Sequence, residues 1–427
     1  MSITLGGVAL SWIEVLGRWL FVAGALLMIV GDAPPSLGFL SWPWLYLALI
    51  GASFVCHGVS GGLGRRDPEG MRLLYRPAAL LLGAFLVSSV FSQVPSLSAT
   101  AFLLVAAIVC ASWMFGKLLD DDHARDAVFA VGALAVILLA GRVIAWRVDE
   151  GLDVAAFQIL NNAWLGKLQL SWVFNLCAPL LLTRLLAEDR PFHAALHGVA
   201  WALAGVATYV LFSRMGMLVF GATTLVVCLS NPGYWRRWVP IVATAVVLGG
   251  VLFARTASMT SYIVASLLDS SQNPGVAMRL AVFQDAIGMF LDHPVVGIGL
   301  GTFDDVAYAQ PGTTANLDFY RNGWHAHNVF LHVLTETGVP GFLAWCYLWY
   351  AIVSRLWRAW RHALPRARLD ATAALCAVFA FLALSSTEVL IAARAHASLR
   401  MNLLIGLVVM LGLRITERQP PVGVETR

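Results

Sequence analysis

The fold class of this chain is clearest in residues 75–117, which read YRPAALLLGAFLVSSVFSQVPSLSATAFLLVAAIVCASWMFGK. A short polar junction separates two continuous apolar runs, 75–92 and 97–117. Each run is close to the roughly 20 residues that a helix needs to cross a bilayer. The short junction predicts that the two helices form an antiparallel hairpin. A transmembrane β-barrel would instead show alternating strands of about ten residues.

The composition of the whole chain agrees with this local pattern. Of the 427 residues, 59% are hydrophobic and 12% are charged, and the mean hydropathy is +0.77. Soluble globular domains carry about 25% charged residues, so a soluble enzyme is excluded. The apolar runs also exclude disorder except at the ends. The composition therefore predicts an all-α polytopic integral membrane protein.

Apolar runs bounded by charges, Pro or Gly predict twelve membrane-spanning helices. Their approximate limits are 9–30, 37–57, 75–92, 97–117, 126–146, 168–187, 192–212, 214–230, 236–254, 327–354, 370–391 and 398–414. Glu14 and Arg18 interrupt the first run, and no basic segment precedes it, so we expect a retained span rather than a cleaved signal. The prediction is a single transmembrane domain over 1–414, followed by a cytoplasmic tail at 415–427.

The loop charges predict the orientation of this domain. If the loops alternate between the two sides, the side of the termini receives twice as many Lys and Arg residues as the other. Basic loops favour the cytoplasm, so both termini are expected there, and the longest connection, 255–326, is expected in the periplasm. Within this connection, apolar residues recur with helical spacing over 276–291. They predict an amphipathic helix along the membrane surface.

Charge and cysteine patterns exclude several other functions. The formal net charge is +4, and the chain lacks the basic stripe with interleaved aromatics that is typical of nucleic-acid binding. The six cysteines lie in apolar runs without paired spacing and are expected to be core residues. Three acidic residues at 120–122 are interpreted as a solvated turn. The glycines at 297, 299 and 301 lack the flanking elements of a nucleotide-binding loop and predict a flexible or tightly packed bend.

Histidines gather where the tenth span opens on the outer side, in the sequence WHAHNVFLHVLTETGVPG at 324–341. Helical spacing predicts one shared face for His325, Asn328, His332 and Glu336. His327 is expected to point elsewhere. Ionisable groups at the mouth of a membrane helix are costly without partners, so we expect a functional site there. Two alternatives stay open: a zinc site, although no His-Glu-x-x-His pattern occurs, and polar side chains that anchor the helix end.

Arginines gather on the same expected side of the membrane. The set comprises Arg142, Arg147, Arg214, Arg255, Arg279 and Arg321. Few acidic residues lie near them in the sequence. Guanidinium groups match phosphate oxygens bidentately, so these arginines are candidates for binding a phosphate or pyrophosphate. Arg214, in the tight junction between the seventh and eighth spans, could instead reach the phosphate of a bilayer lipid.

Three motifs in a fixed order give the sequence a family resemblance. The first is Ser213-Arg214-x-Gly216. The second is Arg279 followed by Asp292-His293-Pro294-Val295-Val296-Gly297-Ile298-Gly299-Leu300-Gly301-Thr302-Phe303. The third is His325-Ala326-His327-Asn328 with Leu331, Glu336, Gly338 and Gly341. Over roughly 200–345, the chain resembles the O-antigen ligase and O-antigen polymerase superfamily.

The resemblance implies a GT-C-like, metal-independent glycosyltransferase on the periplasmic face of a bacterial inner membrane. In the ligase branch, a glycan moves from undecaprenyl pyrophosphate to a sugar hydroxyl of the lipid A-core during lipopolysaccharide assembly. The polymerase branch joins repeat units while both remain linked to the carrier. The His-Asn pair favours His327 as the match for the catalytic histidine of the family, with His325 as the alternative.

The residues agree with this chemistry. Arginines can stabilise a leaving pyrophosphate without a metal, and histidine suits a general base at neutral pH. The expected catalytic residues are His327, His325 and Arg214, with the six arginines binding pyrophosphate and no cofactor. A single displacement would invert the anomeric configuration. The alternatives are a polymerase or protein O-oligosaccharyltransferase of the same superfamily and, more remotely, a transporter of lipid-linked oligosaccharides, for which no convincing internal repeat is found.

Overall fold

The structure of this chain is a computed structural model. It describes residues 2–5, 8–30, 42–60, 69–119, 122–151, 167–255, 261, 274–310, 313, 325–387 and 396–417. The N-terminal residues form an antiparallel hairpin of two short strands, β1 (Ser2–Leu5) and β2 (Val8–Ser11). This hairpin corrects the start of the first expected span, because residues 9–11 pair as a strand, while the all-α class is confirmed for the rest of the described residues. The other elements of the described residues are helical.

Each of the twelve expected spans overlaps one long helix of the described residues. These are α1 (Trp12–Val30), α2 (Trp42–Val59), α4 (Tyr75–Val90), α5 (Pro95–Leu118), α6 (Asp122–Glu150), α8 (Lys167–Ala187), α9 (Pro191–Val210), α10 (Arg214–Leu229), α11 (Trp235–Arg255), α16 (Val329–His362), α17 (Pro365–Ser385) and α18 (His396–Glu417). The shorter or connecting elements are α3 (Glu69–Arg72), the 3-10 helix η2 (Pro232–Tyr234), α13 (Pro274–Asp292) and α14 (Phe303–Ala309).

Five helices in the described part of the chain are long and apolar enough to cross a membrane. They are α5, the Arg125–Asp149 part of α6, the Leu170–Ala187 part of α8, α16 and α17. A sixth span would result if α10 and the first part of α11, which meet at 92°, formed one broken span. The length and apolar composition of these helices indicate a membrane protein. That all twelve helices cross the bilayer, that the domain ends at 414, and that the fold is GT-C-like stay predictions.

Several helices begin where the local sequence favours a helix start. Proline occupies the first position of α5, α9 and α17, at Pro95, Pro191 and Pro365. Its fixed φ suits this position, and the N–H that it lacks would have no partner within the helix. Side chains cap two further helices, Ser213 before α10 and Asn328 before α16. These signals explain why the expected and observed boundaries agree to within a few residues for most of these helices.

The helices pack closely through small residues. The buried side of α17 is rich in alanine, including Ala373, Ala377 and Ala380. This helix lies against α8, α10, α16 and α18. Small residues let helix backbones approach within a membrane, where dispersion contacts drive association. Three of the six cysteines, Cys177, Cys228 and Cys376, are buried as expected, whereas Cys110 is exposed.

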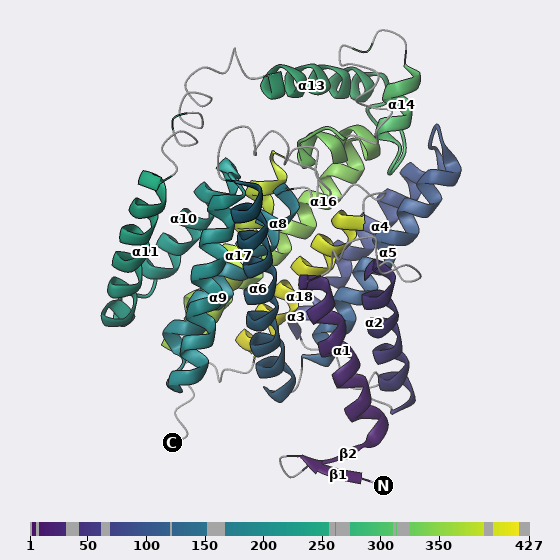
Figure 1. Cartoon of the computed structure of the whole chain (residues 1–427). Coiled ribbons are helices and arrows are strands. Elements are labelled where there is room, and N and C mark those ends of the chain that lie inside the picture. Colours follow the sequence, from purple (N-terminus) through teal and green to yellow (C-terminus); the bar gives the residue numbers. More distant parts are fainter. Residues whose placement is uncertain are drawn as a thin grey trace.

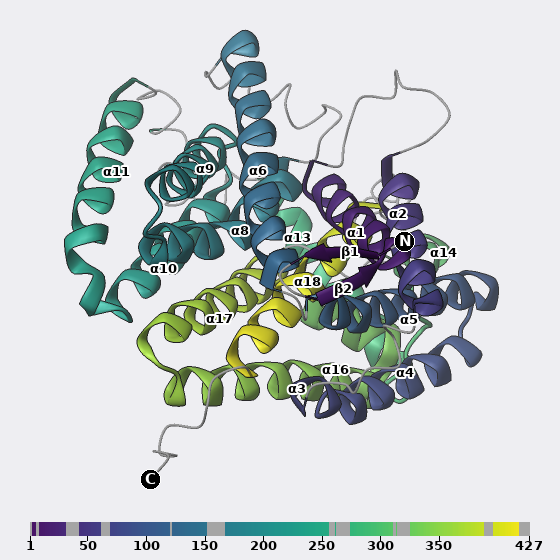
Figure 2. The same cartoon turned by 90° about the horizontal axis from the view of Figure 1, so that it is seen from below.

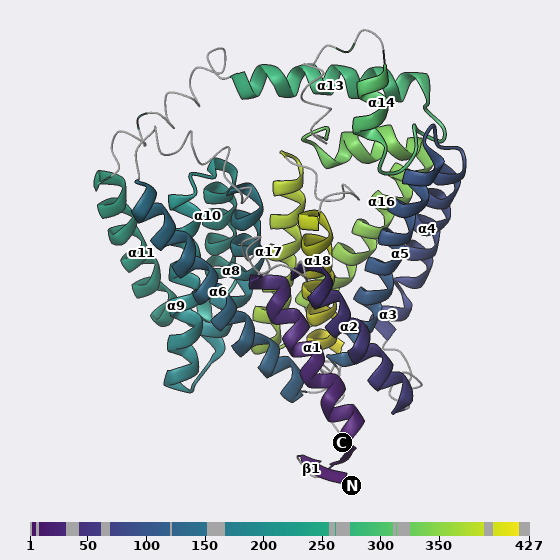
Figure 3. The same cartoon turned by 45° about the vertical axis from the view of Figure 1, so that its right-hand side comes forward.

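A layer of two helices, α13 and α14, lies across one end of the helix bundle (Figure 1). The helix expected at 276–291 is confirmed as α13, which lies roughly crosswise to the long helices (Figure 3). Its position along the membrane surface stays a prediction. The hairpin of β1 and β2 lies at the opposite end, and Figure 2 shows it in front of the bundle when the molecule is seen from below. The N-terminus and the α13–α14 layer are therefore separated by the length of the bundle.

Candidate functional site

The glycine-rich segment after α13 packs tightly against a kink in α16. At Gly338, α16 has non-helical dihedral angles, with φ 65°. Three backbone hydrogen bonds join the segment to α16 at the kink. Ile298 N–H donates to the carbonyl of Thr335 at 3.1 Å, Gly299 N–H donates to the carbonyl of Glu336 at 3.0 Å, and Val339 N–H donates to the carbonyl of Pro294 at 2.9 Å. A Cβ atom at Gly338 would collide with the backbone of the segment. The sequence predicted either a flexible or a tightly packed bend at glycines 297, 299 and 301, and the structure shows the tightly packed bend.

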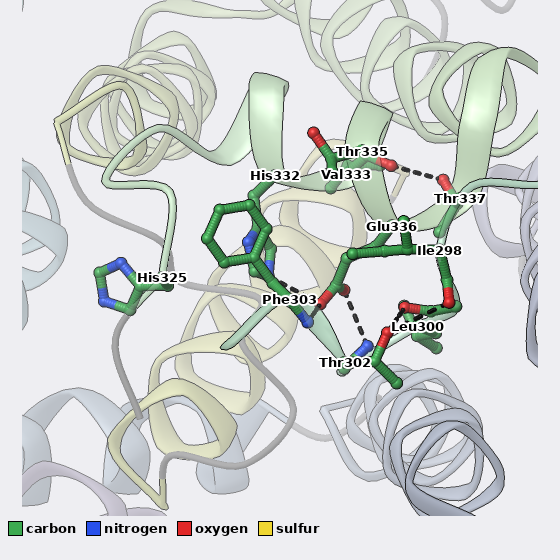
Figure 4. A network of polar contacts seen from close by, with 12 residues as sticks. Ile298, Leu300, Thr302, Phe303, His325, His332, Val333, Thr335, Glu336 and Thr337 are labelled. Carbon is green, nitrogen blue, oxygen red and sulfur yellow. Dashed lines mark hydrogen bonds and ion pairs between the residues drawn. The ribbon is translucent and has the colours of Figure 1, made fainter. Parts of the chain in front are cut away.

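Glu336 anchors this segment to α16 with its carboxylate (Figure 4). One carboxylate oxygen accepts a hydrogen bond from Gly301 N–H at 2.8 Å, and the other accepts from Phe303 N–H at 3.1 Å. Phe303 begins α14, so the negative charge also lies at the N-terminus of that helix, where it is stabilising. The hydroxyl of Ser88 on α4 donates to the backbone carbonyl of Glu336 at 2.8 Å. Glu336 therefore joins α4, α14 and α16.

His332 belongs to the same buried cluster. Its Nε2 lies 3.4 Å from a carboxylate oxygen of Glu336, and its ring centroid lies 5.2 Å from that of Phe303. The side chain is 2% exposed. His332 and Glu336 are therefore buried between α16 and the segment that leads into α14, where they hold these elements together. The sequence placed both on one helix face, one turn apart, and this spacing is confirmed.

The start of α16 corrects the expected position of His325. Asn328 is the N-cap, and its side-chain oxygen accepts hydrogen bonds from Phe330 N–H at 3.0 Å and Leu331 N–H at 3.1 Å. His325 therefore precedes the helix and does not share a helical face with His332. Asparagine is among the residues preferred at this position. The capping signal in the sequence could have located the helix start.

His325 and His327 lie beside each other at the entrance to α16. Their ring centroids are 4.7 Å apart with an edge-on arrangement. The N–H of His327 donates to Nδ1 of His325 at 3.3 Å, so neutral His325 carries its proton on Nε2. His327 has a positive φ of 50°, which is uncommon for a residue with a side chain. Its ring is buried, whereas His325 is half-buried.

The outer layer holds the histidine segment in place. Ala326, between the two histidines, is buried in one apolar cluster with Val282 and Met289 of α13. The hydroxyl of Thr335 also donates to the carbonyl of Ala286 at 3.1 Å, which attaches α13 to α16. The two histidines are therefore positioned by α13 as well as by α16.

Arg147 supports the turn between α9 and α10. Its guanidinium is fully buried, and Nε donates to the carbonyl of Val210 at 3.0 Å. The guanidinium carbon lies 5.4 Å from the ring centroid of Phe212, which has a positive φ of 50°. Arg147 thus reaches the turn from inside the protein, although the sequence placed it among the outward arginines. Its role in pyrophosphate binding stays a prediction.

Arg214 lies at the first position of α10. The hydroxyl of Ser213 accepts from Gly216 N–H at 3.2 Å and caps the helix. A Cβ atom at Gly216 would collide with side chains of Ser171 and Ser213, so this glycine allows α8 and α10 to pack closely. The guanidinium of Arg214 adds its charge to the positive end of the helix dipole, a combination that suits an anion.

Three of the remaining four arginines lie on described helices. Arg279 lies partly buried on α13, and Arg142 is exposed on α6. Arg255 ends α11 with a side chain outside the described residues, and Arg321 lies outside them entirely. Because Arg147 contacts Val210, the C-terminal end of α6 meets the α9–α10 turn. This turn lies toward the end of the bundle that α13 crosses (Figures 1 and 3).

No metal-binding cluster is found in the part of the chain that the structure describes. In this part, no three His, Cys, Asp or Glu side chains gather as a group that could hold a metal ion. The buried His332–Glu336 pair contributes only two such groups, and the carboxylate is occupied by backbone N–H donors. The zinc alternative therefore lacks a ligand set among these residues. The expected absence of a metal stays a prediction.

A comparison with known protein families matches the part of the chain that contains the candidate site. Residues 199–346, about a third of the chain, match the family described as O-antigen ligase. The matched segment includes the capped start of α10, the α13–α14 layer, both histidines and Glu336. A search of curated proteins gave no match to the chain. The resemblance noted in the sequence is thereby confirmed over this segment.

Proposed function

Because this segment resembles O-antigen ligases, we propose that the chain is an O-antigen ligase. It transfers a glycan from undecaprenyl pyrophosphate to a sugar hydroxyl of the lipid A-core, on the periplasmic face of a bacterial inner membrane. The observation that carries this proposal is the pair His325–His327 at the start of α16, toward the same end of the bundle as the N-terminus of α10 with Arg214. The start of α16 supplies a base, and the N-terminus of α10 with Arg214 supplies positive charge for an anionic leaving group.

His327 is the general base of the proposed reaction. It accepts the proton of the acceptor hydroxyl while that oxygen attacks the anomeric carbon. The bond from the anomeric carbon to the pyrophosphate breaks, its electrons leave with the pyrophosphate, and the configuration inverts. His325 is less suited to this role, because its Nδ1 already accepts a hydrogen bond from the backbone N–H of His327. His325 instead packs against the His327 ring and orients it.

Arg214 and Arg279 bind the pyrophosphate in this proposal. Guanidinium forks pair with phosphate oxygens, and their charge stabilises the negative charge that develops on the leaving group. The N–H groups at the start of α10 add to the positive field near Arg214. Arg142, Arg255 and Arg321 attract the donor to this face. No divalent metal or other cofactor takes part.

A deletion strain tests the proposed function through its lipopolysaccharide. Loss of a ligase removes all O-antigen from the core, whereas loss of a polymerase leaves one repeat unit attached. We expect the gel ladder to disappear completely, and to return with the wild-type gene or with His362→Ala, a control at the far end of α16. A core that carries a single repeat would contradict the ligase assignment and identify a polymerase.

A further inference from the structure

Arginines cluster at the turn between α16 and α17. The sequence at 360–368 reads WRHALPRAR and contains Arg361, Arg366 and Arg368. Two residues separate the end of α16 from the start of α17, so the turn is tight. Arg361 and Arg366 are exposed, and Arg368 is half-buried. Three positive charges therefore gather at one helix junction.

Side-chain contacts fix this junction in place. Nε1 of Trp360 on α16 donates to the hydroxyl of Thr372 on α17 at 3.1 Å. The guanidinium carbon of Arg368 lies 5.5 Å from the centroid of the Trp360 ring, and this ring stacks on that of Trp357 with centroids 4.8 Å apart. The two helix ends are thus joined by packing, and the arginines have a rigid support.

The turn lies at the end of the bundle away from the α13–α14 layer. α16 starts beneath that layer, where the hydroxyl of Thr335 donates to the carbonyl of Ala286 on α13. From Gly338 to His362, 24 helical steps of about 1.5 Å make roughly 36 Å. The hydrocarbon core of a bilayer is about 30 Å thick. The last turn of α16 and the arginines therefore reach the level of the lipid headgroups.

The nearby acidic side chains already have other partners. The segment 337–369 contains no acidic residue. Asp189 and Asp370 interact electrostatically with the cluster. Each also forms an ion pair with an arginine outside it, Asp189 with Arg237 at 2.9 Å and Asp370 with Arg184 at 3.6 Å. Positive charge is therefore in excess at the turn.

Apolar side chains are exposed beside these charges. Leu364, in the turn, is 49% exposed, and Trp357 is 48% exposed. Tryptophan is enriched at membrane–water interfaces, where its ring lies at the level of the headgroups. A surface that combines arginines with apolar side chains suits a ligand that has both an anionic and an apolar part. A soluble polyanion has no apolar part.

We propose that the α16–α17 turn binds an anionic phospholipid of the leaflet away from the α13–α14 layer. The lipid phosphate pairs with Arg361 and Arg366, and the acyl chains lie against Leu364. Guanidinium groups match phosphate oxygens bidentately, and basic clusters next to a membrane helix attract anionic lipids. This site is independent of the proposed glycan transfer, because it concerns the bilayer around the protein.

Two matched variants separate a site at the turn from the general positive charge of this end of the bundle. The first combines Arg361→Gln with Arg366→Gln. The control combines Arg72→Gln with Arg76→Gln, two exposed arginines of α3 and the start of α4. Because Ser88, late in α4, contacts α16 near the outer layer, the start of α4 lies toward the same end as the turn. Both variants lose two positive charges.

Native mass spectrometry of delipidated full-length protein in detergent can compare phosphatidylglycerol with phosphatidylcholine as probes. We expect the wild type to bind phosphatidylglycerol at least about tenfold more tightly. Each arginine near an anionic lipid contributes about fivefold in affinity. The turn variant should therefore lose about 25-fold, whereas the control variant should bind like the wild type.

Several outcomes would overturn the proposal. Equal losses in the two variants would show a general field of this end of the bundle rather than a site. Equal binding of the two lipids, or full competition by millimolar inorganic phosphate, would exclude an anionic phospholipid as the ligand.

A second measurement decides if the turn variant does not fold. Wild-type protein in nanodiscs that contain phosphatidylglycerol with a diazirine near its headgroup should crosslink through residues 355–369. Crosslinks confined to other peptides would contradict the proposal.

Discussion

Glu336 shows how a single buried carboxylate organises the candidate site. It is 2% exposed and accepts hydrogen bonds from Gly301 N–H and Phe303 N–H. In Glu336→Gln, the amide can replace only one of the two acceptor oxygens. One buried N–H then loses its partner, which costs about 1–3 kcal/mol. We expect a lower thermal midpoint for Glu336→Gln in detergent, with Asp149→Asn, an exposed position on α6, as the control. Equal midpoints for the two variants would contradict the anchoring role.

Arg214 is expected to act through the geometry of its guanidinium as well as through its charge. A charge-assisted hydrogen bond contributes about 1.5–3 kcal/mol, and lysine cannot reproduce the bidentate fork. Arg214→Lys should therefore lose nearly as much transfer as Arg214→Ala in a membrane assay at matched expression. Arg358→Ala, an exposed position on the second half of α16, should retain activity. Full activity of Arg214→Ala would remove this residue from the site.

The kink of α16 determines how the outer layer is attached. Gly338 has φ 65°, and a Cβ atom there would strike the carbonyl of Val295. We expect Gly338→Ala to destabilise the protein by more than about 1 kcal/mol, because both the dihedral angles and the close approach require glycine. Gly83→Ala, in open helix, should be neutral or stabilising by about 0.5–1 kcal/mol. Denaturant midpoints in detergent compare the two; a Gly338→Ala midpoint at or above that of the wild type would contradict this reading.

The sequence predicted the long helices and α13 because apolar runs and helical spacing are local signals. It did not predict the role of Glu336, because the partners Gly301 and Phe303 lie more than 30 residues away and are held by side-chain-to-backbone contacts. The prediction that His325 lies on the helix was wrong because of a local signal that was not used. The helical spacing was extended back past Asn328, although this residue caps the helix. Apolar periodicity predicts that a helix is present, whereas capping residues are needed to predict where it begins.

At the scale of the whole molecule, the described architecture has two distinct ends. The hairpin of β1 and β2 lies at one end, and the α13–α14 layer lies at the other (Figure 1). The charge bias of the loops predicts that the end with the N-terminus is cytoplasmic and that the end with the α13–α14 layer is periplasmic. The C-terminal part of α18 is held by a hydrogen bond from Arg414 to the carbonyl of Gly116 near the end of α5. The orientation is a prediction that labelling can test.

Introduced cysteines provide that test in a Cys110→Ser background, because Cys110 is exposed. Gln310→Cys, after α14, should react with a membrane-impermeant maleimide in spheroplasts. Asp189→Cys, exposed between α8 and α9, should react only after the inner membrane is permeabilised. The reverse pattern would invert the topology and move the site to the cytoplasm.

The central claim is that His327 acts as a general base in a transfer that needs no metal. The most direct measurement is the rate of glycan transfer by purified protein from undecaprenyl pyrophosphate to lipid A-core in excess EDTA. Base catalysis typically contributes about 10²–10⁴-fold. We expect the wild type to be active in EDTA, His327→Ala to lose activity by this factor, and His325→Ala to lose less. A wild type that stops in EDTA and recovers with zinc or magnesium, or a His327→Ala variant with normal rate, would contradict the account.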